Sequence, residues 1–382
     1  MISKKLSLLL SLFYVLLPLV TPIRVSTSYG EVEGLEESYP NSSFIYKSVS
    51  KFLGIPFAAP PVGDLRMRPP KEPASWKPNV RLAKQHGNIC IQNKISEFYV
   101  RMFTQNFSYD EDCLYLDVYT PNISQLLPVM VYIHGGAYQY GSAITYCGDY
   151  LALYGVVVVV IQYRLGAFGF LTTGDSTAPG NYGMLDQVAA LQWVKGNIKN
   201  FGGDSGKVTI FGFSAGGTSV SLHLLSPVSN GLFQQAIAES GVDLSPFAIQ
   251  PTSFGLHFAN KLAENLNCPT SDHSKMMACI RQKEAKEIQD ASNKIPFKFQ
   301  DYRRWAPVVD KNFLHDTPRS LRNKGEFKKA KLIIVFTSGE GGADMAFIAN
   351  RSYGMVESVD NGVSPSFFRE FLTKSAYARN IR

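Results

Sequence analysis

Residues Lys207 to Gly216 read KVTIFGFSAG, and this stretch decides the fold class. An apolar, β-branched run ends in glycine and reaches Ser214, after which a second apolar stretch, TSVSLHLL, has the character of a helix. A serine on a sharp turn between a strand and a helix is the nucleophile-elbow arrangement, in which small flanking residues allow close packing. We therefore predict that Ser214 is a nucleophile. The alternative is a serine that only caps the following helix.

Further apolar runs lie on both sides of this stretch, at Pro128 to Ile133, Val156 to Ile161, Ala236 to Ala238 and Leu332 to Phe336. Runs without polar alternation predict strands that are buried on both faces, as in a largely parallel sheet. Between two of them, residues 185–194 place apolar side chains near a helical period. The alternation predicts a doubly wound α/β fold, with a mostly parallel central sheet flanked by helices.

The first of these runs ends in His134-Gly135-Gly136-Ala137, which precedes the serine turn in the chain. Backbone N–H groups at a glycine-rich strand end can stabilise an oxyanion without help from side chains. We predict this role for the loop and a structural role for His134. The alternative is an ordinary tight turn.

Composition narrows the possible partners. The 382 residues are 45% hydrophobic and 18% charged, which is typical of a globular chain. The formal net charge is +7, but the basic residues are scattered and form no run. They predict a solvated surface and no nucleic-acid partner. No metal ion or cofactor is expected.

Residues 1–22 have the composition of a signal peptide. Lys4 and Lys5 precede the apolar run Leu6 to Val20, and no clear cleavage site follows. An uncleaved membrane anchor is the alternative, but the run is short for a span and Pro18 interrupts it. We expect no stable membrane span and entry into the secretory pathway, with an extracellular or endoplasmic-reticulum location.

The cysteines and glycosylation motifs agree with that compartment. The five cysteines permit disulfides and leave one thiol over. Behind a signal peptide, four N-x-S/T motifs become candidate glycan sites: Asn41, Asn106, Asn122 and Asn350.

Three long motifs carry a family resemblance. FGGDSGKVTIFGFSAG (Phe201 to Gly216), EDCLYLDVYTP (Glu111 to Pro121) and FLGIPFAAPPVGDLRMRPP (Phe52 to Pro70) resemble segments of the type-B carboxylesterases and cholinesterases. The similarity extends from about Val25 to Phe347. It implies an α/β-hydrolase fold, a carboxylesterase domain over residues 23–382, and a small-molecule carboxylic ester as substrate.

The resemblance also implies roles for individual residues. Ser214 corresponds to the nucleophile and Glu340 to the acid of the catalytic triad. The oxyanion donors correspond to the backbone N–H groups of Gly136, Ala137 and Ala215, although the family often has glycine where this chain has Ala137. Phe213 stands where the family commonly has glutamate, which removes a negative charge beside the site.

The same resemblance implies disulfides between Cys90 and Cys113 and between Cys268 and Cys279, with Cys147 free. It also implies buried ion pairs of Arg66 with Glu111 and of Arg164 with Asp186. The segment between Cys90 and Cys113 contains no tryptophan, unlike the choline-binding segment of cholinesterases, which argues against membership of that branch.

The triad histidine is the main departure. All six histidines precede Glu340, whereas the order in this fold is serine, acid, histidine. Ser364 to Ala378 reads as a helix with no strand after it. We therefore expect a partial, C-terminally truncated domain of a serine carboxylic ester hydrolase that is inactive as it stands. The alternative is a non-catalytic adhesion or ligand-binding relative. The natural ester and the oligomeric state are left open.

Overall fold

The computed structural model describes residues 22–40, 43–93, 100–101, 107–296, 304–338 and 340. A ten-stranded sheet forms the centre of this part, with the strand order β1-β2-β3-β7-β9-β8-β10-β11-β12 and with β4 paired to β2. Its strands are β1 (Ile23–Thr27), β2 (Gly30–Ser38), β3 (Ser48–Pro56), β4 (Val80–Leu82), β7 (Tyr115–Thr120), β8 (Leu127–Ile133), β9 (Val157–Ile161), β10 (Gly203–Phe213), β11 (Gln235–Glu239) and β12 (Lys331–Val335). Strands β5 (Ile89–Cys90) and β6 (Tyr109–Asp110) form a separate pair.

The sheet is mixed, and its parallel part carries the candidate site. Neighbouring strands from β1 to β9 along the sheet order pair antiparallel. From β9 through β8, β10 and β11 to β12 every pairing is parallel. The carboxyl ends of these five strands therefore meet at one edge, where ligands bind in open α/β sheets.

The apolar runs are strands as predicted, and the periodic segment is the helix α4 (Tyr182–Asn197). The expected burial on both faces holds for β9, in which all five residues are buried. It is wrong for β12, in which all five residues are exposed. The reason is position, because β12 is the end of the strand order and among the described residues pairs only with β11.

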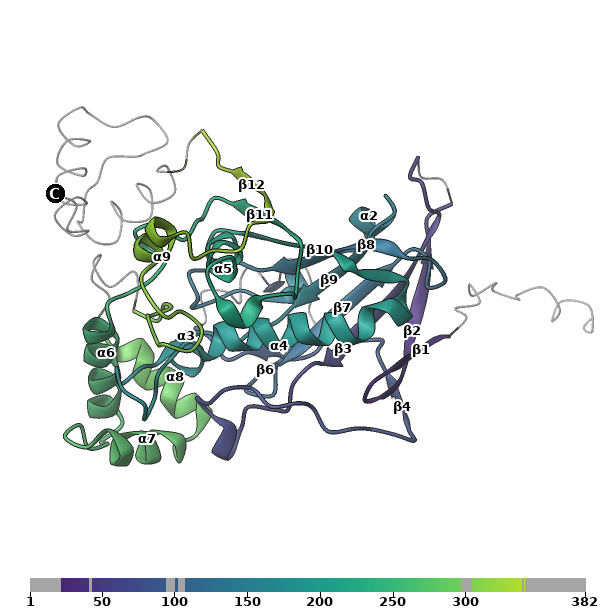
Figure 1. Cartoon of the computed structure of the whole chain (residues 1–382). Coiled ribbons are helices and arrows are strands. Elements are labelled where there is room, and N and C mark those ends of the chain that lie inside the picture. Colours follow the sequence, from purple (N-terminus) through teal and green to yellow (C-terminus); the bar gives the residue numbers. More distant parts are fainter. Residues whose placement is uncertain are drawn as a thin grey trace, which may run out of the picture.

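Helices cover the two faces of the sheet unequally (Figure 1). On one face α4 and α5 (Ala215–His223) contribute buried residues to the larger hydrophobic core. On the other face α2 (Asp149–Ala152) packs against β7 and β9 in a smaller core. The short helix α3 (Gly166–Phe170) is fully buried and contacts α4.

On the second face, a row of residues that pair across neighbouring strands shows where the sheet stops being covered by other residues. The register places Val160, Tyr132, Phe211, Ile237 and Ile333 opposite one another on β9, β8, β10, β11 and β12. Exposure rises along this row from 1% for Val160 to 57% for Ile333. The apolar face of the sheet therefore continues past the part that described residues cover.

A helical group lies at one end of the molecule, on the left in Figure 1. It consists of α6 (Thr252–Asn265), α7 (His273–Arg281) and α8 (Ala285–Lys294). The Cys268–Cys279 disulfide joins the segment after α6 to α7, and the Cys90–Cys113 disulfide lies near the β5–β6 pair. Both are the pairs that the resemblance implies, and Cys147 is a free, exposed cysteine. The helix α9 (Pro318–Lys324) leads into β12.

The two implied ion pairs are buried. Arg66 approaches Glu111 with its Nε at 2.6 Å and its Nη2 at 2.5 Å. Arg164 approaches Asp186 with its Nε at 2.7 Å and its Nη2 at 2.6 Å, in side chains that are 3% and 0% exposed. A bidentate fork of this kind fixes the geometry of both partners. Arg66 also donates to the backbone carbonyls of Arg281 and Lys283, which ties the N-terminal segment to the end of α7.

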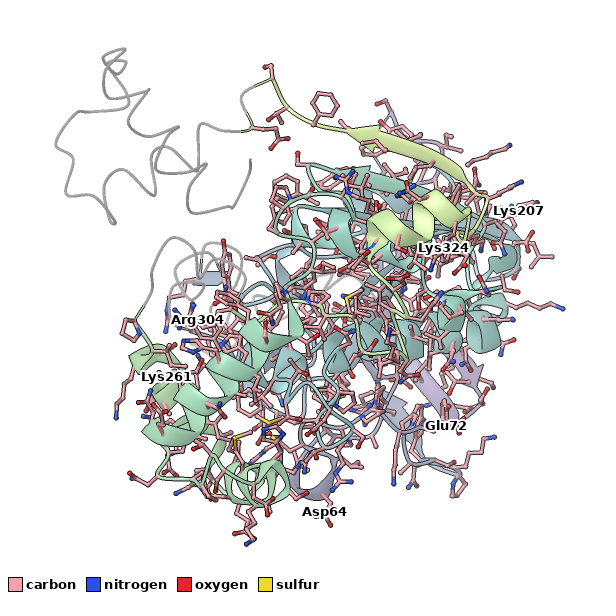
Figure 2. All side chains as sticks on the ribbon, turned by 60° about the vertical axis from the view of Figure 1, so that its left-hand side comes forward. Asp64, Glu72, Lys207, Lys261, Arg304 and Lys324 are labelled. Carbon is pink, nitrogen blue, oxygen red and sulfur yellow. A yellow bond between two sulfur atoms is a disulfide. The ribbon has the colours of Figure 1, made fainter. Side chains whose placement is uncertain are left out.

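Charged side chains are spread over the surface, as the scattered sequence positions suggest. Figure 2 shows Lys207, Lys261 and Lys324 on separate elements of the molecule. In the part of the chain that the structure describes, no helix has both the length and the apolar composition to cross a bilayer.

Candidate active site

Ser214 lies at the turn between β10 and α5, with φ 58° and ψ −120°. A non-glycine residue with positive φ and this ψ is strained, and such strain concentrates at functional sites. The surrounding backbone holds the turn: Ser214 N–H donates to Glu239 O at 2.8 Å, and Ser214 O accepts from Thr218 N–H at 2.9 Å. The serine is partly exposed, which is the geometry of a nucleophile elbow.

The flanking glycines are required by close backbone contacts. A Cβ on Gly212 would lie 2.4 Å from the carbonyl oxygen of Ile133, and one on Gly216 would lie 2.0 Å from the same oxygen. Both distances are far below van der Waals contact. The G-x-S-x-G spacing therefore lets β10 and the start of α5 pack directly on the end of β8.

The glycine-rich loop after β8 lies beside the serine. A Cβ on Gly135 would come within 3.2 Å of Ser214 Cβ. The next three residues, Gly136, Ala137 and Tyr138, all have positive φ, at 109°, 53° and 60°. Among the described residues, no hydrogen-bond acceptor faces the backbone N–H of Gly136 or Ala137. Successive free N–H groups in such a turn form an anion-binding nest.

Ala215 N–H completes the set of expected donors. Ala215 is the first residue of α5, so its N–H has no acceptor in a preceding helical turn. The positive end of the helix dipole lies at the same point. The three predicted oxyanion donors thus come from two segments that both adjoin Ser214.

Glu340 follows β12 at the same edge of the sheet. Its Oε1 accepts hydrogen bonds from Ser240 Oγ at 2.5 Å and from Thr337 N–H at 2.8 Å, and together they hold the pKa of this exposed carboxyl below its usual range. Phe213, Glu239 and Val335 are opposite one another in β10, β11 and β12. Ser214 and Glu340 therefore both follow the carboxyl ends of strands that have β11 between them.

Ser240 was not predicted as a site residue. It lies two residues after the predicted strand Ala236 to Ala238 and directly after β11 in the structure, and it has φ 51°. Its N–H donates to Val335 O at 2.7 Å. The backbone and side chain of Ser240 therefore connect the end of β11 to the end of β12 and to Glu340. Ser240 orients the carboxylate of Glu340.

The side chains beside the serine differ in charge from the family pattern. Phe213 is 46% exposed and carries no charge. Glu239 lies opposite it on β11, and partial burial raises the pKa of the Glu239 carboxyl. An acidic residue is therefore present on the neighbouring strand β11 and not at the position before Ser214.

No histidine contacts Ser214 or Glu340 in the part of the chain that the structure describes, which includes all six histidines. Each ring has another neighbour: His86 with Asp117, His134 with Gly135 O, His223 with Gln187 and Ser229, His257 with the Phe258 ring, His273 with Asp175, and His315 with Glu326. The described site therefore brings together the residues predicted as nucleophile, oxyanion donors and acid, and no histidine lies among them.

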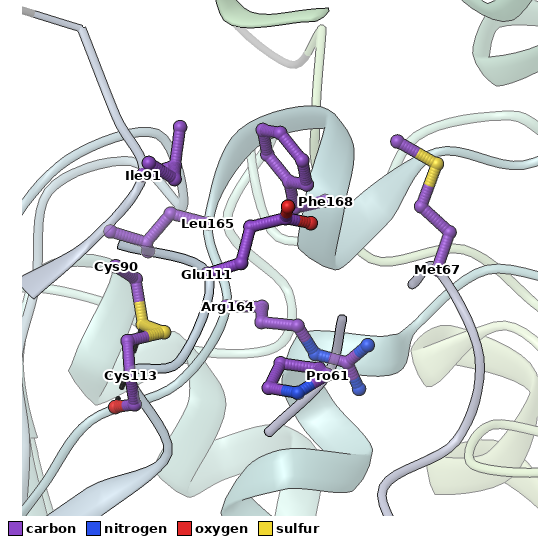
Figure 3. Close-up of a pocket in the computed structure, with 9 residues that line it drawn as sticks. All are labelled: Pro61, Met67, Cys90, Ile91, Glu111, Cys113, Arg164, Leu165 and Phe168. Carbon is purple, nitrogen blue, oxygen red and sulfur yellow. Dashed lines mark hydrogen bonds between the residues drawn. A yellow bond between two sulfur atoms is a disulfide. The ribbon is translucent and has the colours of Figure 1, made fainter. Parts of the chain in front are cut away.

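None of these site residues lines the small pocket of about 10 Å³ that Figure 3 shows. It is lined by the Cys90–Cys113 disulfide and by Glu111 and Arg164, one member of each buried ion pair. The volume is enough for about one water molecule. It is far too small for an ester, so it is a packing defect between the ion pairs and not the substrate site.

Several sequence predictions fall outside the described residues. These are all of the expected signal peptide (residues 1–22) except its last residue, the glycan candidates Asn41, Asn106 and Asn350, and the helix expected at residues 364–378. Asn122 is described: it is partly exposed in the turn after β7, where its Oδ1 accepts from Ser124 N–H at 2.8 Å.

Comparison with known proteins places these features in a family. Residues 21–380 match the model of the carboxylesterase family. The chain is 44% identical over 330 residues to "Pyrethroid hydrolase Ces2e" of Rattus norvegicus, which covers 84% of this chain and 56% of that protein. It is 42% identical over 363 residues to "Cocaine esterase" of Homo sapiens, covering 92% and 62%. It is also 38% identical over 381 residues to "Neuroligin-2" of Mus musculus, covering 90% and 43%.

The chain spans about half the length of these relatives. Two of these relatives are named as a hydrolase and an esterase, and the third is named as a neuroligin. The matches therefore show common descent and a common fold. The mixed sheet with a parallel centre, the flanking helices and the strand-turn-helix serine are the α/β-hydrolase fold. The chain belongs to the carboxylesterase family.

Proposed function

We propose that the site belongs to a serine carboxylic ester hydrolase with Ser214 as its nucleophile. The observation that carries the proposal is the strained elbow at Ser214, which lies against free backbone N–H groups of a second loop. A turn that served only to cap a helix would not need positive φ at the serine and at three residues of the loop beside it. The names of two relatives, a pyrethroid hydrolase and a cocaine esterase, support ester chemistry.

In the proposed reaction Ser214 Oγ attacks the acyl carbon while a base removes the hydroxyl proton. The carbonyl oxygen becomes an oxyanion between the N–H groups of Gly136, Ala137 and Ala215. The alcohol leaves with the proton and an acyl-serine remains, which water then hydrolyses to the free acid. Glu340, oriented by Ser240, would stabilise an imidazolium if an imidazole lay between it and Ser214.

We further propose that residues 1–382 by themselves turn over esters very slowly. All six histidines are engaged elsewhere, and a serine hydroxyl without a base is a weak nucleophile. In a serine protease, loss of the base alone lowers kcat by a factor on the order of 10⁶. An added small imidazole should partly restore turnover if the remaining groups are in place.

The test uses the 382-residue chain with 4-nitrophenyl acetate, with and without imidazole. We expect little turnover alone and a saturable increase with imidazole, beyond the imidazole-only reaction. Ser214→Ala is the matched control, because imidazole hydrolyses such esters slowly without a protein. Equal rates for wild type and Ser214→Ala would contradict the nucleophile, and fast turnover without imidazole would contradict the missing base.

A non-catalytic binding protein is the second candidate. It is favoured by the absence of a histidine contact at Ser214 and by the 38% identity to a neuroligin. A fluorophosphonate separates the two proposals, because it labels an activated serine. Mass-spectrometric mapping that finds no label on Ser214 in the presence of imidazole would favour the binding protein.

We propose that the protein passes through the secretory pathway. The two disulfides support this, since disulfides persist in oxidising compartments. In a secreting cell line, glycosidase treatment should increase gel mobility, and Asn122→Gln should remove part of that shift. Mobility unaffected by glycosidase would contradict the proposal.

A further inference from the structure

The imidazole ring of His134 makes one hydrogen bond among the described residues, through Nδ1. His134 directly follows β8 and is fully buried, with Nδ1 2.9 Å from the carbonyl oxygen of Gly135. A carbonyl oxygen only accepts, so Nδ1 must carry a proton. Nε2 has no hydrogen-bond partner among the described residues. Burial lowers the pKa of the ring to about 4, so His134 is a neutral imidazole whose one proton is on Nδ1.

The ring is held from several sides. It stacks on Tyr163 with ring centroids 4.4 Å apart, and Tyr163 Oη donates to His134 O at 2.8 Å. Gly141 lies so close that a Cβ there would be 2.5 Å from His134 Nδ1. Gln92 fixes Gly141 through two hydrogen bonds, one to its carbonyl oxygen at 2.8 Å and one from its N–H at 2.9 Å. The imidazole therefore has one available orientation.

The hydrogen bond acts on the peptide unit that supplies an oxyanion donor. Gly135 C=O and Gly136 N–H belong to the same planar peptide group, in which the two bonds point in opposite directions. Fixing the carbonyl toward His134 therefore directs Gly136 N–H away from it. The two following residues, Ala137 and Tyr138, have positive φ, so this peptide group begins a strained turn.

We infer that His134 is a positioning residue of the oxyanion hole: its Nδ1–H holds the Gly135–Gly136 peptide so that Gly136 N–H faces the acyl oxygen. This inference rests on the proposed function. It differs from a purely structural role because the effect is on the transition state. Loss of the anchor should lower kcat and leave KM nearly unchanged, since the donor matters most once the oxyanion forms.

The experiment compares His134→Asn with His134→Leu in imidazole-assisted ester turnover. Asparagine Nδ2 occupies nearly the position of histidine Nδ1 and can donate to Gly135 O, whereas leucine cannot. We expect His134→Leu to lower kcat about 10- to 100-fold, within the range for an oxyanion donor, and His134→Asn to restore most of it. Equal kcat values for the two variants would overturn the inference.

Two measurements keep the inference testable if leucine unfolds the protein or if the ester reaction fails. His134→Gln is a polar substitute whose amide extends past Gly135 O, so it should behave as leucine does; activity equal to His134→Asn would overturn the inference.

Nitrogen-15 NMR of the histidine rings at neutral pH should show His134 neutral and protonated at Nδ1, independently of catalysis. A charged ring or an Nε2–H tautomer would overturn it. Absence of fluorophosphonate labelling of wild-type Ser214 in the presence of imidazole would instead remove the proposed function.

Discussion

Strands β9 and β12 are both short apolar runs, VVVVI and KLIIV, and both lie in the parallel part of the sheet. All residues of β9 are buried between strands β7 and β8 and beneath helices, whereas all residues of β12 are exposed. The difference teaches that an apolar run specifies a strand through its side-chain shape, while its burial depends on what packs against it. The same contrast extends to the segments that follow the two strands, since Arg164 after β9 is buried and Glu340 after β12 is exposed.

The largest effect is expected at the end of β9. Arg164→Ala should lower the free energy of unfolding by about 3–5 kcal/mol, because Asp186 would remain as a buried, unpaired charge. Chemical denaturation monitored by circular dichroism measures this. Lys261→Ala is the control: it breaks an exposed pair with Glu264 and should cost less than about 1 kcal/mol. Equal losses in the free energy of unfolding for the two variants would show that the buried ion pair after β9 contributes no more to stability than an exposed pair.

The second prediction compares one substitution in both strands. Ile161 in β9 is 0% exposed and Ile334 in β12 is 52% exposed. Ile161→Ala should cost about 2–5 kcal/mol because it leaves a cavity in a packed core. Ile334→Ala should cost less than about 1 kcal/mol, because about half of the Ile334 surface stays in contact with water and its removal leaves no closed cavity. Equal costs in denaturant titrations would mean that β12 is covered in solution.

A substitution on the exposed face of β12 should have the smallest effect on stability but a measurable effect on association between copies of the chain. Ile333→Lys should change the free energy of unfolding by about 0.5 kcal/mol or less, because Ile333 is 57% exposed. It should reduce concentration-dependent association measured by analytical ultracentrifugation, because a charge on an edge strand opposes strand pairing. Leu126→Lys, at 58% exposure in the segment before β8, is the matched control and should have no such effect. Indistinguishable association of the two variants would contradict a role for the strand edge.

These differences also define what the sequence could predict. The runs around residues 128–133, 156–161 and 207–211 predicted strands because their side chains are apolar and mostly β-branched, and the glycines around Ser214 predicted the sharp turn. Both are local properties. The exposure of β12 could not be predicted, since it depends on neighbours across the sheet and not on the run itself. The antiparallel strands β1 to β3 were also not predicted from their own composition: β2, for example, has the sequence GEVEGLEES.

The candidate site also contains residues that local sequence motifs predict and residues that they do not. The local motifs gave Ser214 and the loop at Gly136 and Ala137, because glycine spacing and strand ends are visible in the sequence. Glu340 alone has the appearance of a glutamate in a solvent-exposed turn, and only family resemblance assigned it a role. The hydrogen bond from Ser240 could not be predicted, because its partners are 100 residues apart in the chain and meet only when β11 and β12 pair.

The strained backbone of Ser214 has a consequence for the balance between stability and chemistry. A serine at φ 58° and ψ −120° costs about 1–3 kcal/mol that glycine would not. Replacing Ser214 by glycine would therefore relieve this strain at the cost of the hydroxyl group. The Ser214 turn is therefore a place where a more stable backbone and the presence of a hydroxyl group exclude each other.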